Sequence, residues 1–182
     1  MIHHLSIPVR DPRHTADVAA VVKICIAAGV PFLPRGAGTS LAGGCLPIGG
    51  GVMIVLTRMK RILEINLRDR YAVVEPGVTQ GQLYEFLAER HPNLWMDSTG
   101  AGPGASLVGN TLDRGFGHTP YGDHFGHTCG MEVVLADGRV LRTGFGHYEG
   151  ARAANAFRYG VGPILDGLFS QSGLGIVTRI GL

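Results

Sequence analysis

The chain has 182 residues, 45% of them apolar, so its length and composition suit one folded domain with a sizeable core. Sixteen Lys and Arg against 14 Asp and Glu leave a net charge of +2 without a basic stripe, which argues against nucleic-acid binding. No apolar run is long enough to cross a bilayer, and the first residues lack the apolar core of a signal peptide. Three scattered cysteines favour a reducing compartment, so we expect a cytoplasmic protein without disulfides.

The N-terminal part of the chain predicts a strand, a helix and a second strand, which together make a βαβ unit. We expect strands over residues 7–9 and 30–34, with a helix between them that has Thr15 as its N-cap and Gly29 as its C-terminal glycine cap. The apolar residues of this helix recur at helical spacing and form one face, made of Val18, Val21, Val22, Cys25 and Ile26.

The middle of the chain predicts a buried strand, a hairpin and an amphipathic helix. The β-branched, apolar run over 52–57 is typical of a buried strand, and 61–66 pairs with 71–77 as a hairpin. The helix covers 79–92, with Thr79 as a candidate cap. Its apolar face is made of Leu83, Phe86 and Leu87.

The composition of the sequence changes near Trp95. We expect the Trp95 side chain itself to be buried in the core. Residues 97–123 are rich in Gly, Ser, Thr and His with little periodicity, which is typical of a long functional loop. We next expect a hairpin over 130–144 that turns at Asp137 and Gly138, followed by a loop or short helix over 148–157. A helix is predicted over 163–172, with Ile164, Leu165 and Leu168 on one side. A closing strand over 174–182 ends the sequence. We therefore expect an α+β fold in two lobes, about 1–94 and about 95–182, that meet at a cleft.

The stretch "PRGAGTSLAGG", residues 34–44, follows an apolar run and contains almost nothing that could fill a core. Glycines let main-chain N–H groups turn toward a diphosphate and approach it closely, and Thr39 and Ser40 add hydroxyl donors. Arg35 adds positive charge, although it could equally be a structural anchor. The loop lacks the Gly-Lys-Ser/Thr ending of a P-loop and leads to a strand instead of a helix, which argues against a nicotinamide-binding Rossmann fold. A flexible surface loop is the alternative.

Two further segments combine glycines with polar residues: "STGAGPGASLVGN", residues 98–110, and "QSGLGIVT", residues 171–178. Three such segments, far apart in sequence, could converge on one long ligand. A single phosphate would not need all three. This pattern favours an extended, phosphate-bearing cofactor.

Four long motifs resemble the FAD-binding domain of the vanillyl-alcohol oxidase / p-cresol methylhydroxylase flavoprotein family, in order and over nearly the whole chain. They are "PRGAGTSLAGG", "AVVEPGVTQGQL", "GNTLDRGFGHTPYGDHFGHTCGMEVVLADGRVLRTG" and "YGVGPILDGLFSQSGLGIVTRIG". The later half looks closest to the 4-alkylphenol and vanillyl-alcohol branch, whereas the first loop looks more like the D-lactate and glycolate dehydrogenase branch. An FAD-dependent enzyme of cell-wall precursor reduction shares the fold, but "TPYGDH" and "GLFSQS" argue against it.

The resemblance implies a PCMH-type fold of two lobes, each a small mixed sheet with helices, with FAD extended in the cleft between them. It implies that the first loop holds the pyrophosphate, that the turn after Pro76 lies near the adenosine half, and that the later segments line the diphosphate, flavin and ribityl portions. The implied FAD-binding residues are Pro34, Arg35, Gly36, Ala37, Gly38, Thr39, Ser40, Gly77, Val78, Thr99, Gly100, Gly104, Ala105, Ser106, Gly109, Asn110, Tyr121, Gly122, Gly175, Ile176 and Val177.

The sequence departs from the family pattern at two places that matter for chemistry. Thr39 stands where some members have the His that attaches FAD covalently, so attachment at that position is excluded. "STGAGPG" stands where the phenol branch carries an Asp near the flavin, and Asp97 just upstream does not correspond to that Asp. The catalytic residues are therefore not assigned.

The segment "HTPYGDHFGHT" places His118, Asp123, His124 and His127 close together in sequence. This spacing matches no helical zinc motif and lacks a second cluster, so we expect hydrogen bonds within the loop or a position beside the flavin, and no metal.

The sequence thus predicts the FAD-binding domain of a flavin-dependent oxidoreductase that takes hydride from an alcohol or a 4-alkylphenol. A D-lactate or glycolate dehydrogenase-type flavoprotein is one alternative, and a non-catalytic flavin-binding module or truncated remnant is another. The family's substrate-binding cap domain is absent from this sequence, so we expect that a cap-bearing subunit or segment completes any active site.

Overall fold

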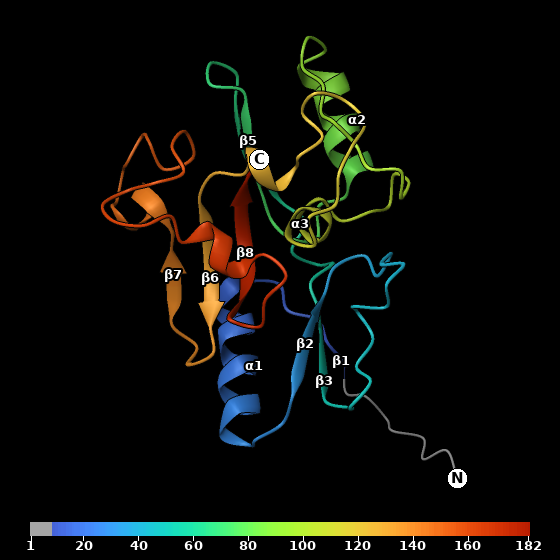
Figure 1. Cartoon of the computed structure of the whole chain (residues 1–182), viewed down its shortest axis with the longest axis vertical. Helices are drawn as coiled ribbons and strands as arrows, with labels where there is room; N and C mark the ends of the chain where they lie inside the picture. The colour runs from blue at the N-terminus through green and yellow to red at the C-terminus, as the bar shows by residue number, and fades with distance from the viewer. Residues whose placement is uncertain (1–8) are drawn as a thin grey trace.

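The computed structural model describes residues 9–182 and contains two β-sheets (Figure 1). The smaller sheet is parallel and has the strand order β1-β3-β2, with β1 at Val9–Arg10, β2 at Phe32–Arg35 and β3 at Val52–Val55. The expected first strand over 7–9 lies partly outside the described residues. The predicted βαβ unit is present, but β3 inserts between its two parallel strands.

The larger sheet is antiparallel and has the order β4-β5-β8-β6-β7. Its strands are β4 (Ile62–Asn66), β5 (Tyr71–Val74), β6 (Met131–Leu135), β7 (Val140–Arg142) and β8 (Gly175–Gly181). Both predicted hairpins and the closing strand are confirmed. The division between the two sheets falls between β3 and β4 and does not coincide with residue 94, because β5 pairs with β8 from the end of the chain.

Helix α1 (Thr15–Ala27) packs between the two sheets. Its buried residues Val18 and Val22 share a cluster with Ile54 of β3 and with Val134 and Ile176 of the larger sheet. Burial of the same helix face by both sheets ties them into one body, because apolar area removed from water stabilises the contact by about 25 cal/mol per Å².

Two details of α1 differ from the prediction. The N-cap is His14 rather than Thr15, and the Thr15 hydroxyl instead donates a hydrogen bond to Glu132 Oε1 at 2.8 Å. Ile26 is 52% exposed, so the apolar face is narrower than its spacing predicted. Gly29 has φ +64° and is the expected glycine cap.

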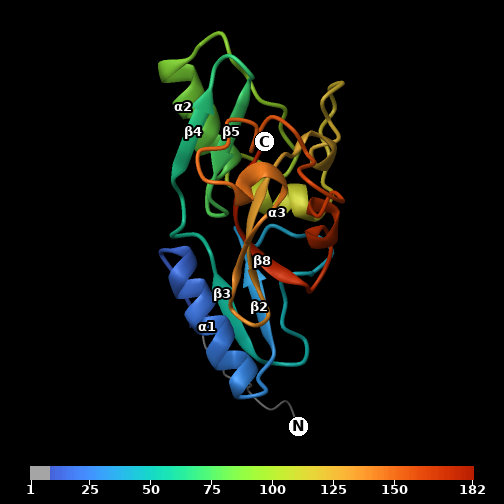
Figure 2. The same cartoon turned by 90° about the vertical axis from the view of Figure 1, so that its left-hand side faces the viewer.

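Helix α2 (Gln80–Arg90) lies at the opposite end of the molecule from α1 (Figure 2). Thr79 caps it as predicted and accepts a hydrogen bond from Gln82 N at 3.3 Å. Leu83 and Leu87 are buried in a second core cluster with Val74, Val133 and Ile180 of the larger sheet.

Two segments were predicted incorrectly in the second half of the chain. The loop over 97–123 contains a short helix, α3 (Leu107–Leu112), which Ser106 caps by accepting from Gly109 N at 3.0 Å. The helix expected over 163–172 is instead a 3-10 turn, η3 (Asp166–Phe169), and Ile164 and Leu168 are each 50% exposed. The remaining 3-10 turns are η1 (Phe125–His127) and η2 (Gly144–His147). No helix among residues 9–182 is long and apolar enough to cross a membrane.

Candidate functional site

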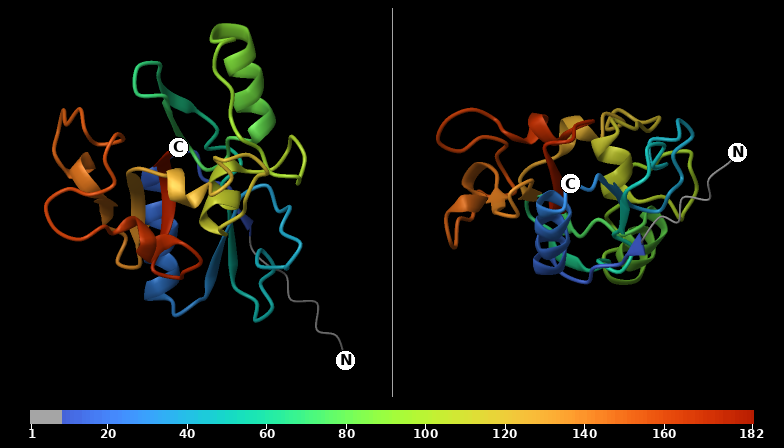
Figure 3. Two further views of the ribbon diagram at one scale, coloured as in Figure 1. Left: turned by 45° about the horizontal axis from the view of Figure 1, so that its top comes forward. Right: turned by 90° about the horizontal axis from the view of Figure 1, so that it is seen from below.

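Two of the glycine-rich segments meet beside the N-terminus of α3, with the turn after β5 between them. A Cβ atom on Gly36 would lie 3.0 Å from both Cβ and Oγ of Ser106. The Ser106 hydroxyl in turn donates a 2.7 Å hydrogen bond to the carbonyl of Pro76. Figure 3 shows the loop after β2 lying next to α3. Gly36, Ser106 and the turn that leads into Gly77 therefore lie at one place.

The segment before β8 lies at the other end of α3. Gln171 N donates to the Leu112 carbonyl at 2.9 Å, and Arg114 Nε donates to Ser170 Oγ at 3.0 Å. The first and third glycine segments thus flank the same short helix.

Arg35 is the cation of the first loop. Its guanidinium folds over Gly38, which has φ +76°, a conformation that favours glycine. Arg35 Nη1 lies 3.7 Å from the sulfur of Met53, and no carboxylate among residues 9–182 forms an ion pair with it. A half-buried cation without an acidic partner is suited to bind an anion.

Gln80, which sequence reasoning did not single out, holds the second loop in place. Its side-chain amide donates from Nε2 to the Thr99 carbonyl at 3.2 Å and to the Gly102 carbonyl, and its Oε1 accepts from Thr99 N at 3.2 Å. Gln80 is 7% exposed. Its place in the quoted motif "VTQGQL" was the available signal, but only the fold shows that the loop lies beside it.

The predicted glycines differ in how closely other protein atoms surround them. Gly77, Gly122 and Gly175 are packed against protein: a Cβ on Gly175, for example, would lie 2.5 Å from Val133 Cγ1. At Gly100 and Gly104 an added Cβ would have no protein atom within 4 Å, and neither residue has a positive φ. Their open surroundings leave room for a ligand, so these two glycines fit a cofactor that approaches the main chain.

The other predicted residues lie within or between these elements. Pro34 and Arg35 end β2, and Gly36, Ala37, Gly38, Thr39 and Ser40 follow it; Gly77 and Val78 connect β5 to α2; Thr99 to Ser106 form the second loop; Gly109 and Asn110 lie in α3; Tyr121 and Gly122 precede η1; Gly175, Ile176 and Val177 begin β8. The Val78, Ala105, Ile176 and Val177 side chains are buried, so only their main chains are available to a ligand.

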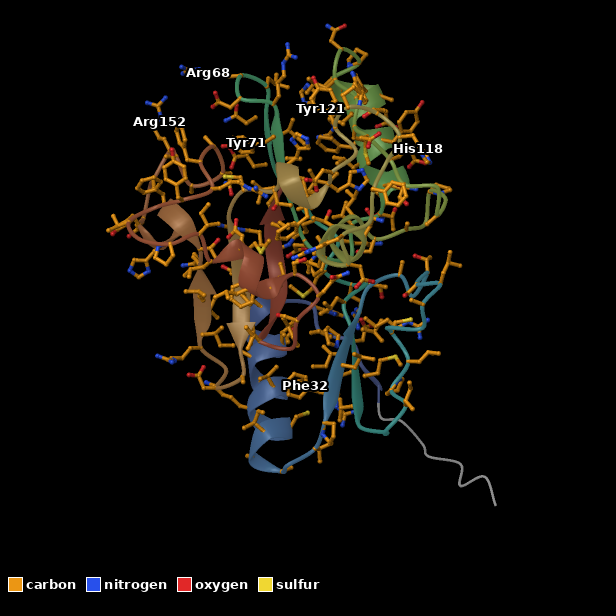
Figure 4. All side chains as sticks on the ribbon, in the orientation of Figure 1. Phe32, Arg68, Tyr71, His118, Tyr121 and Arg152 are labelled. Carbon is orange, nitrogen blue, oxygen red and sulfur yellow. The ribbon has the colours of Figure 1, made fainter. Side chains whose placement is uncertain are left out.

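A cavity of about 1060 Å³ opens beside the second loop. The β4–β5 hairpin, α2, α3 and residues 121–129 and 152–158 surround it, and Figure 4 shows Arg68, Tyr71, Tyr121 and Arg152 at this end of the molecule. Of the predicted cofactor residues, Thr99, Ser106, Asn110 and Tyr121 line the cavity, whereas the first loop and the start of β8 do not. The predicted site therefore extends from this cavity along α3 rather than filling one enclosed pocket.

Trp95 lies at the cavity and not in the core. The prediction that it is buried was wrong: its side chain is 63% exposed, and its ring meets that of Tyr121 edge to face at 5.9 Å. Apolar character alone predicted burial, but this side chain is on the open wall of a hollow.

The side chains of the histidine-rich segment each contact different residues and do not gather at one point. His124 Nδ1 lies 2.6 Å from Asn110 Oδ1, and His124 Nε2 lies 3.0 Å from Asp97 Oδ2. His127 packs on Tyr121, His118 packs on Phe116, and Asp123 accepts from Gly126 N. The hydrogen bonds of His124 agree with the expected role within the loop, and the described residues hold no cluster of three or more His, Cys, Asp or Glu that could bind a metal.

The cysteine that lines the cavity is a weakly acidic thiol. Burial raises the pKa of Cys129 to about 11, and the negative charge of Asp166 acts in the same direction. Cys25, which we expected on the packed face of α1, is buried, and all three cysteines are free.

A mixed α/β fold whose glycine-rich turns converge beside an unpaired arginine defines a domain that binds a phosphate-bearing cofactor. The family model described as an FAD binding domain matches residues 8–144. This chain belongs to that family, as an FAD-binding domain of p-cresol methylhydroxylase-type flavoproteins, and its cofactor is FAD.

The chain is similar to one part of several larger proteins, two of which are named for a phenol. It is 44% identical to a 1'-carboxy-chondrochloren decarboxylase from Chondromyces crocatus over 93% of this chain, and 43% identical to the flavoprotein subunit of 4-cresol dehydrogenase from Pseudomonas putida over 91%. The chain spans only 32% of each of those proteins. A structure of 4-ethylphenol oxidase from Gulosibacter chungangensis aligns with a TM-score of 0.91 and 44% identity, covering 96% of this chain and 34% of that one. A glycolate oxidase subunit from Bacillus subtilis is a more distant relative, 32% identical over 92% of this chain and 34% of its own length.

Proposed function

We propose that the chain holds FAD along α3, with the diphosphate at the first loop and the flavin toward the cavity. The observation that carries this proposal is the meeting of the Arg35–Gly36 turn with Ser106, which sets a cation without an ion-pair partner among residues 9–182 beside the N-terminus of α3. Arg35 would neutralise phosphate charge, and the main chain at Gly100 and Gly104 would approach the cofactor closely.

The start of β8 supports the same placement. Gly175, Ile176 and Val177 pair with β6 on one side, while the described pairing with β5 covers only Ile180 and Gly181. Main-chain groups on the β5 side of residues 175–177 are therefore free of strand pairing and could bond a ligand.

We further propose that the domain serves an oxidoreductase that acts on a 4-alkylphenol or a related alcohol. Bound FAD supplies the redox chemistry by accepting a hydride from the substrate. The chain's own part is to bind and orient the cofactor, and a further segment or subunit would complete the substrate pocket. The three free cysteines fit a reducing compartment such as the cytoplasm.

The first loop keeps a hydroxy-acid substrate as a second candidate, since its sequence resembles the D-lactate and glycolate branch and the glycolate oxidase subunit is a relative. Asp97, the acid nearest in sequence to the missing family Asp, lies 3.0 Å from His124 Nε2 through its Oδ2 atom. A module that binds flavin without turnover is the third candidate.

Titration of the purified chain with FAD, followed by flavin fluorescence, tests the cofactor site. We expect Arg35→Met to weaken FAD about tenfold, a loss of about 1.4 kcal/mol, and ADP to compete with FAD in the wild type. Arg139→Met is the matched control, because Arg139 is exposed in the β6–β7 turn. Equal affinities for the two variants would rule out Arg35 as the diphosphate ligand.

Anaerobic addition of 4-ethylphenol, vanillyl alcohol, D-lactate or glycolate then separates the substrate classes. Bleaching of the bound flavin by the phenol or alcohol supports the main proposal, and bleaching by a hydroxy acid supports the second candidate. Bound FAD that no compound reduces, in a preparation reconstituted with its cap-bearing segment or subunit, indicates the non-catalytic module.

A further inference from the structure

Three side chains from three separate segments form a buried hydrogen-bonded unit at the cavity wall. The His124 ring lies between Asp97 and Asn110, with both ring nitrogens within hydrogen-bond distance of a side-chain oxygen, at 3.0 and 2.6 Å. The side chains of His124 and Asp97 are only 13% and 8% exposed. Burying a carboxylate and an imidazole is costly unless each is paired, so the unit depends on all of its hydrogen bonds.

The chain wraps closely around this unit at two glycines. A Cβ on Gly117 would overlap the carboxylate of Asp97, and a Cβ on Gly115 would overlap the amide of Asn110. The loop after α3 therefore packs directly against both side chains, and a side chain at Gly115 or Gly117 would require Asn110 or Asp97 to shift.

The Asp97–His124–Asn110 unit connects the second glycine loop to α3, the two segments to which we assign FAD binding. Asp97 directly precedes the second glycine loop, and Asn110 lies one turn into α3, whose cap Ser106 meets Gly36. Asp97, His124 and Asn110 all line the cavity together with Thr99 and Ser106. Fixing Asp97 to Asn110 through one ring thus sets where the loop over 98–104 lies relative to α3.

We propose that Asp97, His124 and Asn110 are a positioning unit that holds the second glycine loop against α3 in the geometry that binds FAD. Both ring nitrogens of His124 lie within hydrogen-bond distance of partners within the fold, which suits a structural role. The link to FAD affinity rests on the proposed function, whereas the effect on the loop does not.

Two readouts on the 182-residue chain test this role separately. Hydrogen exchange in the cofactor-free chain measures how well the amides of residues 98–104 are held, and fluorescence titration measures FAD affinity. We expect Asp97→Ala to speed exchange in this loop and to weaken FAD about tenfold. Asp113→Ala, at the exposed end of α3, and His118→Gln, in the same histidine-rich segment, are matched controls that should change neither.

Swapping the carboxylate at position 97 with the amide at position 110 distinguishes this positioning role from a general loss of stability. Asp97→Asn alone removes the carboxylate, whereas Asp97→Asn combined with Asn110→Asp moves it to the other ring nitrogen and keeps His124 between an acid and an amide. We expect the double variant to recover most of the loop protection and FAD affinity lost in the single variant, and to show protected His124 ring N–H signals by NMR.

The outcomes separate the two proposals. A double variant no better than Asp97→Asn, or loop exchange in Asp97→Ala equal to that in Asp113→Ala, overturns the positioning unit. In a further outcome, hydrogen exchange in the loop rises in Asp97→Ala and recovers in the double variant, but even the wild type fails to bind FAD. That result retains the positioning of the loop and overturns the proposed cofactor site.

Discussion

The side chain of Gln80 and the main chain of Thr99 are paired in both directions, with Nε2 donating to the Thr99 carbonyl and Thr99 N donating to Oε1, each at 3.2 Å. The side-chain amide both donates to and accepts from the main chain of Thr99, as a neighbouring β-strand would, although this loop pairs there with no strand of the described residues. Because the pair joins α2 to the glycine loop over 98–104, it couples the cofactor site to the second core.

Removal of this pairing should loosen the loop. We expect Gln80→Ala to remove the side-chain partner of the half-buried Thr99 and Gly102 peptide groups and to destabilise the chain by about 0.5–1.5 kcal/mol. Hydrogen exchange at the Thr99 amide, which donates to Gln80 Oε1, should be faster, and FAD affinity should be lower. Glu89→Ala, exposed on the same helix, provides the control. Unchanged exchange in the Gln80 variant would show that other contacts hold the loop.

Two glycine substitutions should separate an effect on FAD binding from an effect on the stability of the chain. Gly104→Ala meets open space, so the melting temperature without cofactor should not change while FAD binds more weakly. Gly175→Ala forces a methyl group against Val133 and the Val134 carbonyl, so the chain itself should lose about 1–3 kcal/mol through overpacking. Thermal unfolding with and without FAD measures both effects. A Gly104 variant that binds FAD normally would remove this turn from the site.

Acid should destabilise the chain in part through Glu132, which joins α1, β7 and β8. Burial opposes ionisation of Glu132, but hydrogen bonds from Thr15 and Arg142 outweigh it and lower the pKa. A lowered pKa in the folded state means that the unfolded chain takes up a proton first as the pH falls. The stabilisation from Glu132 is therefore present above about pH 4.3 and is lost as the pH drops through the lowered value.

Urea unfolding of Glu132→Gln across this pH range checks the sign. The variant should be less stable than the wild type by about 1–3 kcal/mol near neutral pH, and the difference should shrink in acid. Glu89→Gln serves as the exposed control. A stability difference that stays constant with pH would mean that the carboxylate charge of Glu132 contributes nothing.

Alkylation should distinguish Cys129 from the other partly accessible cysteine. With its pKa raised to about 11 by burial and by Asp166, Cys129 carries little thiolate at mildly alkaline pH and should react slowly with iodoacetamide. Cys45, which is half-buried and directly follows the first glycine loop, should be modified sooner, as measured by mass spectrometry of peptides. The urea-unfolded chain, in which all three cysteines react, is the reference. Equal rates for Cys129 in folded and unfolded chains would contradict the raised pKa.

Local pattern was enough to predict the strands, both hairpins and the two longer helices, because alternation, helical spacing and glycine caps act over neighbouring residues. The glycine-rich pattern predicted a phosphate-bearing cofactor, and the resemblance of four long motifs to a flavoprotein family implied that this cofactor is FAD. The helix expected over 163–172 failed because apolar spacing cannot show whether a partner surface exists, and Ile164 and Leu168 face outward.

Only the tertiary structure decided which segments meet. Strand β5 pairs with β8 across most of the chain, which moves the boundary between the sheets away from residue 94, and Trp95 is exposed because a cavity opens beside it. The contacts of Gln80 with Thr99, and of Asp97 with Asn110 through His124, join residues whose separation in sequence carries no periodic signal. Such contacts form only once the core fixes the elements that carry them, so the sequence by itself determined the elements and the cofactor, and the fold determined the site.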